Sequence, residues 1–502
     1  MKTGRRKSTS VNIFVTFLYQ LITILIGFII PQLFLNTYGP RIHGLTSSIS
    51  NVMSYVLLLN AGLNTASVEA LYEPIAKYKT YDLNAKLNAI KRQYILTGFL
   101  YIIAILIIAL TLPVTIDDMS YRFVFAMVIV MGLQSTMDSF LISYYRILLQ
   151  ADQKLYINNF FIIGTQILRG IFQVILILNN TSPIIVQSVP GILILLHYIL
   201  LLNYVKKNYP FLDKNVPRDE SAISKRWSAL IHQISGLILN NMDIILLTIV
   251  SGNMILVSIY SVYELVFNHL YSMLKSIFST AIVASFGNLI ATKELKTLRN
   301  SYNIFEFIYY SVVVIVYSIA GTMILPFVRL YTSGVSDIPY IDVNLAILFV
   351  IRGILNSLKV PGNTLIDAAG LFKETQSRAI LEALINVTLS IILIKPLGMY
   401  GLLFAAIGGF VFRLTDFIIY TNKNILLKTS SKSFFRVLIV LFNIAISILI
   451  YRVIFSLEIN NWITWLFSAF ISGLISLIIV LVTSTLFEFK LIKSIVNEIK
   501  AK

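Results

Sequence analysis

Long apolar runs separated by short polar segments dominate the chain. A helix of about 20 apolar residues is long enough to cross a bilayer. By that measure we expect about fourteen spans, at 11–35, 44–72, 93–113, 121–149, 156–178, 182–204, 227–250, 254–290, 304–328, 341–367, 376–396, 400–422, 435–456 and 462–486. The pattern predicts an all-α integral membrane protein.

The connections between the runs predict how the helices are oriented. Most of the 40 Lys and Arg residues lie in the two terminal segments and in alternate loops, such as 77–92, 206–226, 293–299 and 423–436. Positive charge gathers in cytoplasmic loops, and an even number of spans returns the chain to its starting side. We therefore expect both termini in the cytoplasm. A basic segment before the first run, without a small-residue cleavage motif, favours a retained first helix over a removed signal peptide.

The longest cytoplasmic loop separates spans one to six from spans seven to twelve. We predict an N-terminal lobe at 1–204, a cytoplasmic linker at 205–226, a C-terminal lobe at 227–422, and two accessory helices with a tail at 423–502. A weak internal repeat supports the division, because 148–151 (LLQA) closes the fourth span and 365–368 (LIDA) closes the tenth. Duplicated halves are common among transporters.

Composition narrows the function further. The chain of 502 residues is 57% hydrophobic, only 13% charged and free of cysteine, which excludes disulfides, thiolate metal sites and cysteine nucleophiles. The net charge of +17 is explained by the cytoplasmic loops, so it does not predict nucleic-acid binding. No phosphate-binding glycine loop and no metal-ligand spacing of histidines occurs, and the loops are short. We expect a protein that is not an enzyme and needs no cofactor or metal.

The most informative polar residues lie inside the tenth span. Arg352, Asn356, Lys359 and Asn363 follow the spacing of one helical face. A cation at the bilayer centre costs about 2.5–3.5 kcal/mol, so it is rarely kept without a partner or a wet cavity. Neither cation has a carboxylate three or four residues away, so the partner must come from another span or from a ligand. We take these four residues as candidate ligands for an anion.

Other spans carry polar stripes as well. Arg169 in the fifth span and Lys275 in the eighth are further candidate cations, while Asp243 and Glu264 could balance charge or couple an ion. The sequence thereby predicts a net cationic, hydrated cavity that suits a phosphate-bearing anion, since Arg and Lys bind phosphate oxygens. The stripes of the first two spans fit ordinary helix–helix hydrogen bonds better, and Arg413 with Asp416 fits a structural ion pair.

Several short motifs resemble one group of bacterial membrane proteins. They are 38–39 (YG), 44–45 (GL), 47–49 (SSI), 62–63 (GL), 71–72 (LY), 232–236 (HQISG), 240–243 (NNMD), 260–263 (YSVY), 285–288 (SFGN) and 395–401 (KPLGMYG). As a set, across about residues 10 to 420, they resemble Wzx-type polysaccharide flippases of the MOP superfamily, whose relatives are MATE antiporters and lipid II flippases.

This resemblance implies two six-helix lobes that alternate access to a central cavity, in the plasma membrane of a bacterium. The implied cargo is an undecaprenyl-diphosphate-linked oligosaccharide that moves from the inner to the outer leaflet for surface polysaccharide synthesis. Membrane lipid, a polysaccharide polymerase and other assembly proteins are the implied partners.

Two alternatives stay open. A lipid II flippase has a similar architecture and a cationic cavity. A MATE-type multidrug antiporter fits less well, because the first six spans offer only Glu69 and Asp138 as coupling carboxylates.

Overall fold

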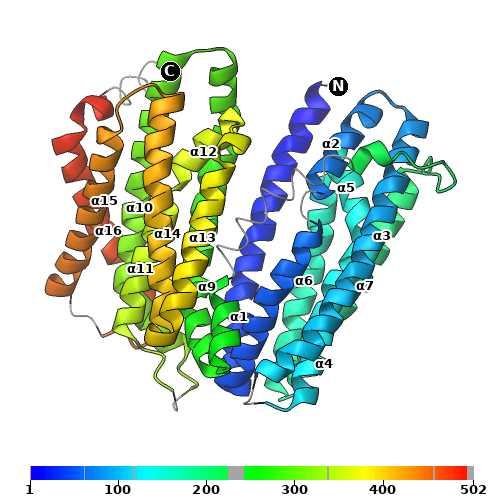
Figure 1. Cartoon of the computed structure of the whole chain (residues 1–502), viewed down its shortest axis with the longest axis horizontal. Helices are drawn as coiled ribbons and strands as arrows, with labels where there is room; N and C mark the ends of the chain where they lie inside the picture. Colours follow the sequence, from blue (N-terminus) through cyan, green and yellow to red (C-terminus); the bar gives the residue numbers. More distant parts are fainter. Residues whose placement is uncertain are drawn as a thin grey trace. The chain divides into compact units, whose positions relative to one another are not determined.

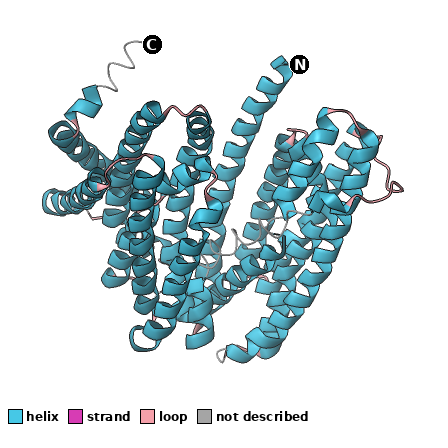
Figure 2. Cartoon of the chain, turned by 45° about the horizontal axis from the view of Figure 1, so that its top comes forward, coloured by secondary structure: helices cyan, strands magenta, loops and turns pink. Residues whose placement is uncertain are grey.

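The computed structural model describes residues 2–60, 63–116, 119–223, 242–335, 338–455 and 458–493. Across those ranges the chain is helical and contains no β-strand, which confirms the all-α prediction (Figures 1 and 2). The α-helices are α1 (Lys2–Val56), α2 (Leu63–Ala76), α3 (Thr80–Thr111), α4 (Tyr121–Met137), α5 (Ser143–Ala151), α6 (Leu155–Leu178), α7 (Pro183–Asn208), α9 (Met254–Ala291), α10 (Leu295–Tyr331), α11 (Val343–Leu358), α12 (Val360–Ala369), α13 (Phe372–Leu397), α14 (Met399–Tyr420), α15 (Ser431–Ile454) and α16 (Trp462–Phe487).

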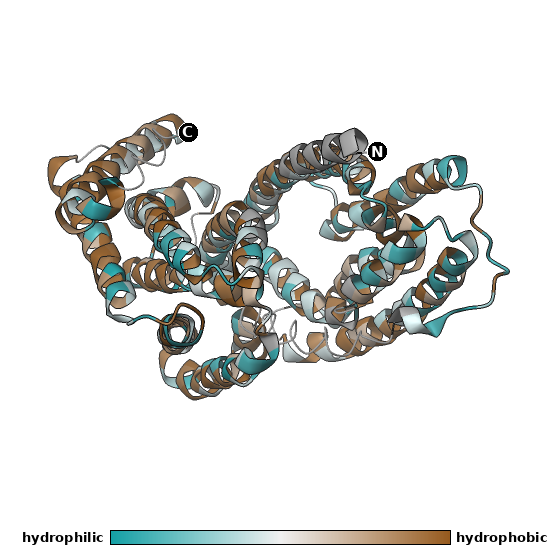
Figure 3. Ribbon diagram, turned by 90° about the horizontal axis from the view of Figure 1, so that it is seen from above, coloured by the Kyte–Doolittle hydropathy of each residue, from teal (hydrophilic) through white to brown (hydrophobic). Residues whose placement is uncertain are grey.

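Among the described residues, 12 helices are long and apolar enough to cross a membrane. One of them, Leu18–Val56, covers most of the first predicted span and part of the second. Most of the seventh predicted span lies outside the described residues, which resume with the short apolar helix Met242–Ser251. Figure 3 shows the helices largely in the colour of hydrophobic residues. The count of fourteen and the orientation of the termini stay predictions.

Three spans are interrupted in their interior. Gly39 has a φ of +81° and breaks α1 just before Pro40, a conformation that L residues rarely adopt. A π-helical turn, Asp138–Ile142, separates α4 from α5. Lys359 separates α11 from α12, and Pro361 follows it without an N–H for the helical ladder. π-helical turns inside α-helices are frequent at functional sites.

The chain divides into two compact units, Met1–Ile259 (unit 1) and Tyr260–Lys502 (unit 2). In unit 1 the segment after residue 242 packs closely on α1: a Cβ added at Gly44 would lie 1.8 Å from the carbonyl oxygen of Met254. Nearby, the hydroxyls of Ser48 and Thr248 lie 2.8 Å apart. Only glycine permits that backbone approach, so Gly44 fixes the packing of α1.

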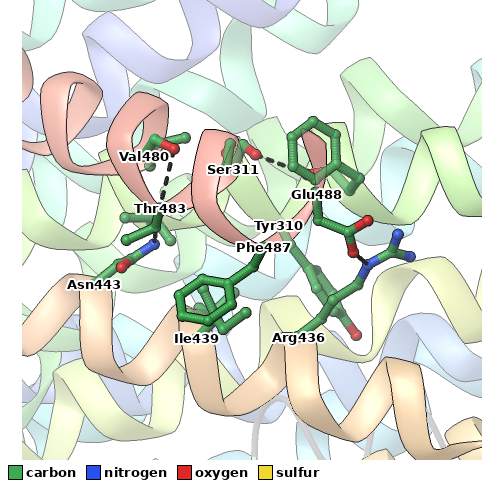
Figure 4. Close-up of a pocket in the computed structure, with 13 residues that line it drawn as sticks. Tyr310, Ser311, Arg436, Ile439, Asn443, Val480, Thr483, Phe487 and Glu488 are labelled. Atoms are coloured by element: carbon green, nitrogen blue, oxygen red, sulfur yellow. Dashed lines mark hydrogen bonds and ion pairs between the residues drawn. The ribbon is translucent and has the colours of Figure 1, made fainter. Parts of the chain in front are cut away.

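In unit 2, α15 and α16 pack against α10. Arg436 on α15 donates to Glu306 of α10 at 2.6 Å and to Glu488, just beyond α16, at 2.7 Å. Figure 4 shows the Arg436–Glu488 contact beside a further bond, from the Asn443 amide to the Thr483 hydroxyl at 2.9 Å. These polar contacts join the accessory helices to one another and to α10, as helix–helix hydrogen bonds do in membranes.

Candidate functional site

A cluster of ionised side chains, most of them buried, forms ion pairs between α9 and α11 and between the α11–α12 break, α13 and α14 in unit 2. We call it the charged cluster. It contains Glu264, Arg352, Lys359, Arg378, Glu382, Arg413 and Asp416.

Lys359 lies at the break between α11 and α12. Its Nζ donates to Glu382 Oε1 at 2.8 Å and lies 3.6 Å from the ring centroid of Phe410. Only 9% of Lys359 and 3% of Glu382 is exposed. The ammonium group is therefore held between a carboxylate and an aromatic face, both of which stabilise a buried cation.

Glu382 and Asp416 extend this contact into a row of alternating charges. Arg413 lies 3.5 Å from Glu382 and 2.9 Å from Asp416, and Arg378 contacts Asp416 at 2.9 Å from the other side. The pairing of Arg413 with Asp416 confirms the prediction from their spacing. Glu382 is thereby shared between Lys359 and Arg413.

Arg352 has a carboxylate partner as well. Its guanidinium lies 3.7 Å from Glu264 on α9, and both side chains are buried. Both cations of the tenth span therefore have partners on other spans, which is one of the two alternatives that the sequence left open. The sequence could show that no partner lies on the same helix, but it could not show which acids approach from α9 and α13. Glu382 is a residue that sequence reasoning missed.

Three further predicted ligands lie on α9, α11 and α12. The Asn363 amide donates to Asp367 in its own helix at 2.8 Å. Asn356 is partly buried one turn before Lys359. Lys275 on α9 is exposed, with its Nζ 5.9 Å from the ring centroid of Tyr271.

A second polar site lies wholly inside unit 1. A cavity of about 190 Å³ is bordered by α1, α4, α6, α7 and the π-helical turn, and we call it the unit 1 cavity. Asp138 of the turn accepts a bond from Arg146 at 2.6 Å and another from Ser143 at 2.9 Å. His197 is 5% exposed and its Nε2 has no hydrogen-bond partner within the described chain. The cavity thus combines a neutralised ion pair with a free ring nitrogen.

Arg169 of α6 also lines the unit 1 cavity. Its Nε donates to Gln173 at 3.1 Å. No described carboxylate lies within 4.0 Å of its guanidinium, in contrast to Arg146 in unit 1 and to Arg352, Lys359 and Arg413 in unit 2. The remaining N–H groups have the fork geometry that binds carboxylate or phosphate oxygens. Chemically, the cavity suits a small anion.

The predicted residues thus fall into separate parts of the chain. Arg169 and Asp243, the latter 1% exposed, belong to unit 1. The other predicted residues belong to unit 2. A single cavity lined by both groups stays a prediction. Among the described residues, no three His, Asp or Glu side chains are grouped to hold a metal ion.

The fold of this chain is similar to the fold of solved membrane proteins described as a lipid II flippase and as MATE family transporters. The lipid II flippase MurJ, in an inward closed conformation, matches with a TM-score of 0.71 and 13% identity, over 95% of this chain and 99% of that chain. An inward-facing multidrug resistance MATE family transporter matches with a TM-score of 0.63 and 13% identity, over 80% of this chain and 94% of its own.

A mutant of the Vibrio cholerae MATE transporter VcmN matches with a TM-score of 0.52 and 15% identity, over 85% of this chain and 99% of its own. No family model matches the sequence, and no curated protein sequence matches it. At these identities the likeness establishes the common fold.

Proposed function

We propose that this protein is a flippase that moves an undecaprenyl-diphosphate-linked oligosaccharide from the inner to the outer leaflet of a bacterial plasma membrane. The repeat unit then enters surface polysaccharide synthesis, with a polymerase and other assembly proteins as partners. The lipid tail stays in the bilayer, while the diphosphate and sugars cross through the protein by alternating access. Support comes from the shared fold, the motif set and the buried cations within membrane-length helices.

The observation that carries the proposal is the environment of Arg169. Arg169 is partly buried and has no described carboxylate within 4.0 Å, and such a guanidinium is costly in a membrane unless an anion or water occupies its site. The cavity beside it, of about 190 Å³, gives such an anion room, and Gln166 adds an amide to the lining. A phosphate of the cargo supplies the missing negative charge.

The charged cluster of unit 2 provides a second binding step. When a phosphate approaches Lys359, Glu382 does not become an unpaired charge, because Arg413 already lies 3.5 Å from it. At Arg352, an incoming phosphate displaces Glu264. Asn356, Asn363 and Lys275 are further contacts along the path. Asp243 and Glu264 balance the cations or couple an ion.

Energy for the export of an anion is available without a nucleotide. The inside-negative membrane potential favours outward movement of negative charge by about 2.3 kcal/mol per charge per 100 mV. A cation-lined path lowers the barrier for that movement. Coupling to a proton or sodium ion would add to this drive.

Paired substitutions test whether Lys359 serves the cargo or only its ion pair. Lys359→Met should cause lipid-linked repeat units to accumulate on the cytoplasmic side, with normal insertion. The double variant Lys359→Met with Glu382→Gln removes both partners and leaves no lone charge at that contact. We expect it to stay defective, since the cargo still lacks its cation.

Lys373→Met, at an exposed position of α13, is the matched control and should export normally. Normal surface polysaccharide in the double variant would overturn the role of Lys359 in binding. Normal polysaccharide after deletion of the whole chain would overturn the proposed function.

One observation favours a second candidate, lipid II itself. The match to MurJ extends over 95% of this chain, whereas the match to the inward-facing MATE transporter extends over 80%. Depletion of the protein separates the candidates. Failure of cell-wall synthesis would point to lipid II, and loss of a surface polysaccharide with an intact wall would point to our proposal. Export of cationic dyes from vesicles would instead indicate a MATE-type antiporter.

A further inference from the structure

A larger cavity, of about 960 Å³, opens at one end of unit 1, away from the residues of the unit 1 cavity. The ends of α2, α5 and α7 and the beginnings of α3 and α6 surround it. Its lining combines aromatic rings with a small set of charges: Tyr72, Tyr78, Asp152, Lys154, Tyr209 and Phe211. We call it the tyrosine pocket. Its volume is at the upper end of the range for small-molecule sites, about 300–1,000 Å³.

The wall of the tyrosine pocket is fixed by the segment after α7. The Asn84 side chain of α3 donates to the Phe211 carbonyl at 2.9 Å and accepts from the Asp213 N–H at 3.1 Å. One turn later, Asn88 donates to the carbonyls of Asp213 and Val216, both at 3.0 Å. The first part of the predicted linker is therefore held on α3, and the site is formed before any ligand arrives.

The charges of the tyrosine pocket neutralise one another. Asp152 accepts from the Tyr209 hydroxyl at 2.6 Å and from Lys154 at 2.8 Å. Lys79 at the rim pairs with Asp82 at 3.4 Å. Burial, together with the bond to Asp152, raises the pKa of Tyr209, so its hydroxyl stays a donor. A pocket without surplus cation does not select a phosphate, but fixed donors and acceptors suit a ligand rich in hydroxyl groups.

The aromatic rings supply the other half of the recognition. Tyr72, Tyr78 and Phe211 are 51%, 79% and 42% exposed, although they border a concave site. Tyrosines also gather at membrane surfaces, where they anchor helices toward lipid. Here they share one cavity with Asp152 and Lys154. An aromatic face with negative π density attracts the C–H bonds on the apolar face of a sugar ring.

We infer that the tyrosine pocket binds the saccharide part of the cargo before transport. The class of ligand in this inference rests on the proposed function. The side of the membrane on which the pocket lies rests on the predicted orientation of the helices. The helix ends that form the pocket are expected in the cytoplasm, where glycosyl transfer onto the lipid carrier must precede export. Anionic phosphates would be bound elsewhere, at Arg169 and in the charged cluster, so the glycan and the diphosphate are recognised separately.

The test is direct binding of lipid-free glycans to the purified full-length protein. The probe is the oligosaccharide mixture released by mild acid from all polyprenyl-linked saccharides of the host cell, which contains the cargo whichever carrier pathway it serves. Calorimetry should detect binding by the wild type. Tyr72→Ala and Tyr78→Ala should each weaken it by about ten-fold or more. Tyr81→Ala, 62% exposed on α3 but outside the lining, is the matched control and should bind like the wild type.

The inference would be overturned if the wild type did not bind the glycans, or if Tyr72→Ala and Tyr78→Ala bound them as tightly as the wild type. Complete competition by glycerophosphate would also overturn it, because the pocket would then be a site for phospholipid headgroups. The conservative change Tyr209→Phe removes only the hydroxyl that donates a hydrogen bond to Asp152. It keeps the test valid if the alanine variants fail to fold. It should weaken binding while the melting temperature is kept. Full export by Tyr72→Ala and Tyr78→Ala would also count against the pocket, whereas export that survives deletion of the chain would overturn only the proposed function.

Discussion

The buried cations of the two units differ in whether a described carboxylate lies beside them. In unit 2, Lys359 and Arg413 share Glu382, at 2.8 and 3.5 Å. In unit 1, Arg146 has Asp138 at 2.6 Å, but Arg169 in the same cavity has no described carboxylate within 4.0 Å. A positive charge inside a membrane helix therefore has two distinct explanations, a structural partner on another helix or a ligand that comes and goes.

This difference matters because the two arrangements respond oppositely to loss of a charge. Removing one partner of a buried pair leaves the other charge uncompensated, which costs about 3–5 kcal/mol. Removing a cation that has no partner leaves nothing uncompensated and relieves its own burial cost. Stability measurements can therefore separate structural charges from binding charges.

The largest effect on stability is expected at Glu382. Glu382→Ala leaves both Lys359 and Arg413 without this carboxylate, although Asp416 still neutralises Arg413. We expect the free energy of unfolding to fall by about 3–5 kcal/mol. Thermal and denaturant unfolding of the purified protein in detergent would measure the loss.

Glu374→Ala is the matched control, because Glu374 is exposed at the beginning of the same helix. It should change stability by less than about 0.5 kcal/mol. If Glu382→Ala proved as stable as this control, the charged cluster would not be a set of structural pairs, and the contrast between the units would disappear.

Arg169 should show the reverse behaviour. Arg169→Met keeps most of the side-chain volume and removes the fork of N–H donors, so the melting temperature should stay the same or rise. Export should fall by about 10- to 100-fold, because a hydrogen bond to a charged group contributes about 1.5–3 kcal/mol. Accumulation of lipid-linked repeat units in the inner leaflet measures this loss. The matched control is Arg122→Met, at an exposed position at the beginning of α4, and it should export normally. If Arg169→Met lowered the melting temperature but left export unchanged, Arg169 would have a structural role.

The sequence predicted the helical architecture because the length of an apolar run is a local property. It also predicted the Arg413–Asp416 pair, since residues three apart on a helix are neighbours. Contacts between helices are not local, so neither Glu382 beside Lys359 nor Glu264 beside Arg352 could be assigned. One available signal was overlooked: Glu382 is an acid within a predicted span, and such a residue requires a partner.

The tyrosine pocket could not be predicted for a related reason. Its rings come from three separate helix ends and from the segment held by Asn84, and nothing in their spacing indicates that they meet. The interruption at Lys359 was easier to predict from the sequence, because Pro361 lies inside the predicted span. Proline removes one bond of the helical ladder, and this favours a break one or two residues earlier.

The smallest effect is expected where paired charges lie at the end of a span, beside Glu488. Burial alone would raise the pKa of Glu488, but the hydrogen bonds from Arg436 and Lys432 outweigh it and lower the pKa below 4.5. A carboxylate with a depressed pKa stabilises the folded state fully above its unfolded value, and this contribution is lost as pH falls through the folded value. Glu488→Gln should therefore melt below the wild type at pH 7, and the gap should close as the pH is lowered below about 4.3.

Glu458→Gln, at an exposed position between α15 and α16, should show no such gap at either pH, since exposed charges contribute little to stability. A gap at Glu488 that stayed constant down to pH 3 would mean that its charge does not support the folded state. The pairing with Arg436 would then be a consequence of helix packing rather than a cause of it, and the same doubt would extend to the pairs around Glu382. A gap that closes with falling pH would show that the ion pairs of Glu488 stabilise the fold, in contrast to Arg169, which has no described carboxylate within 4.0 Å.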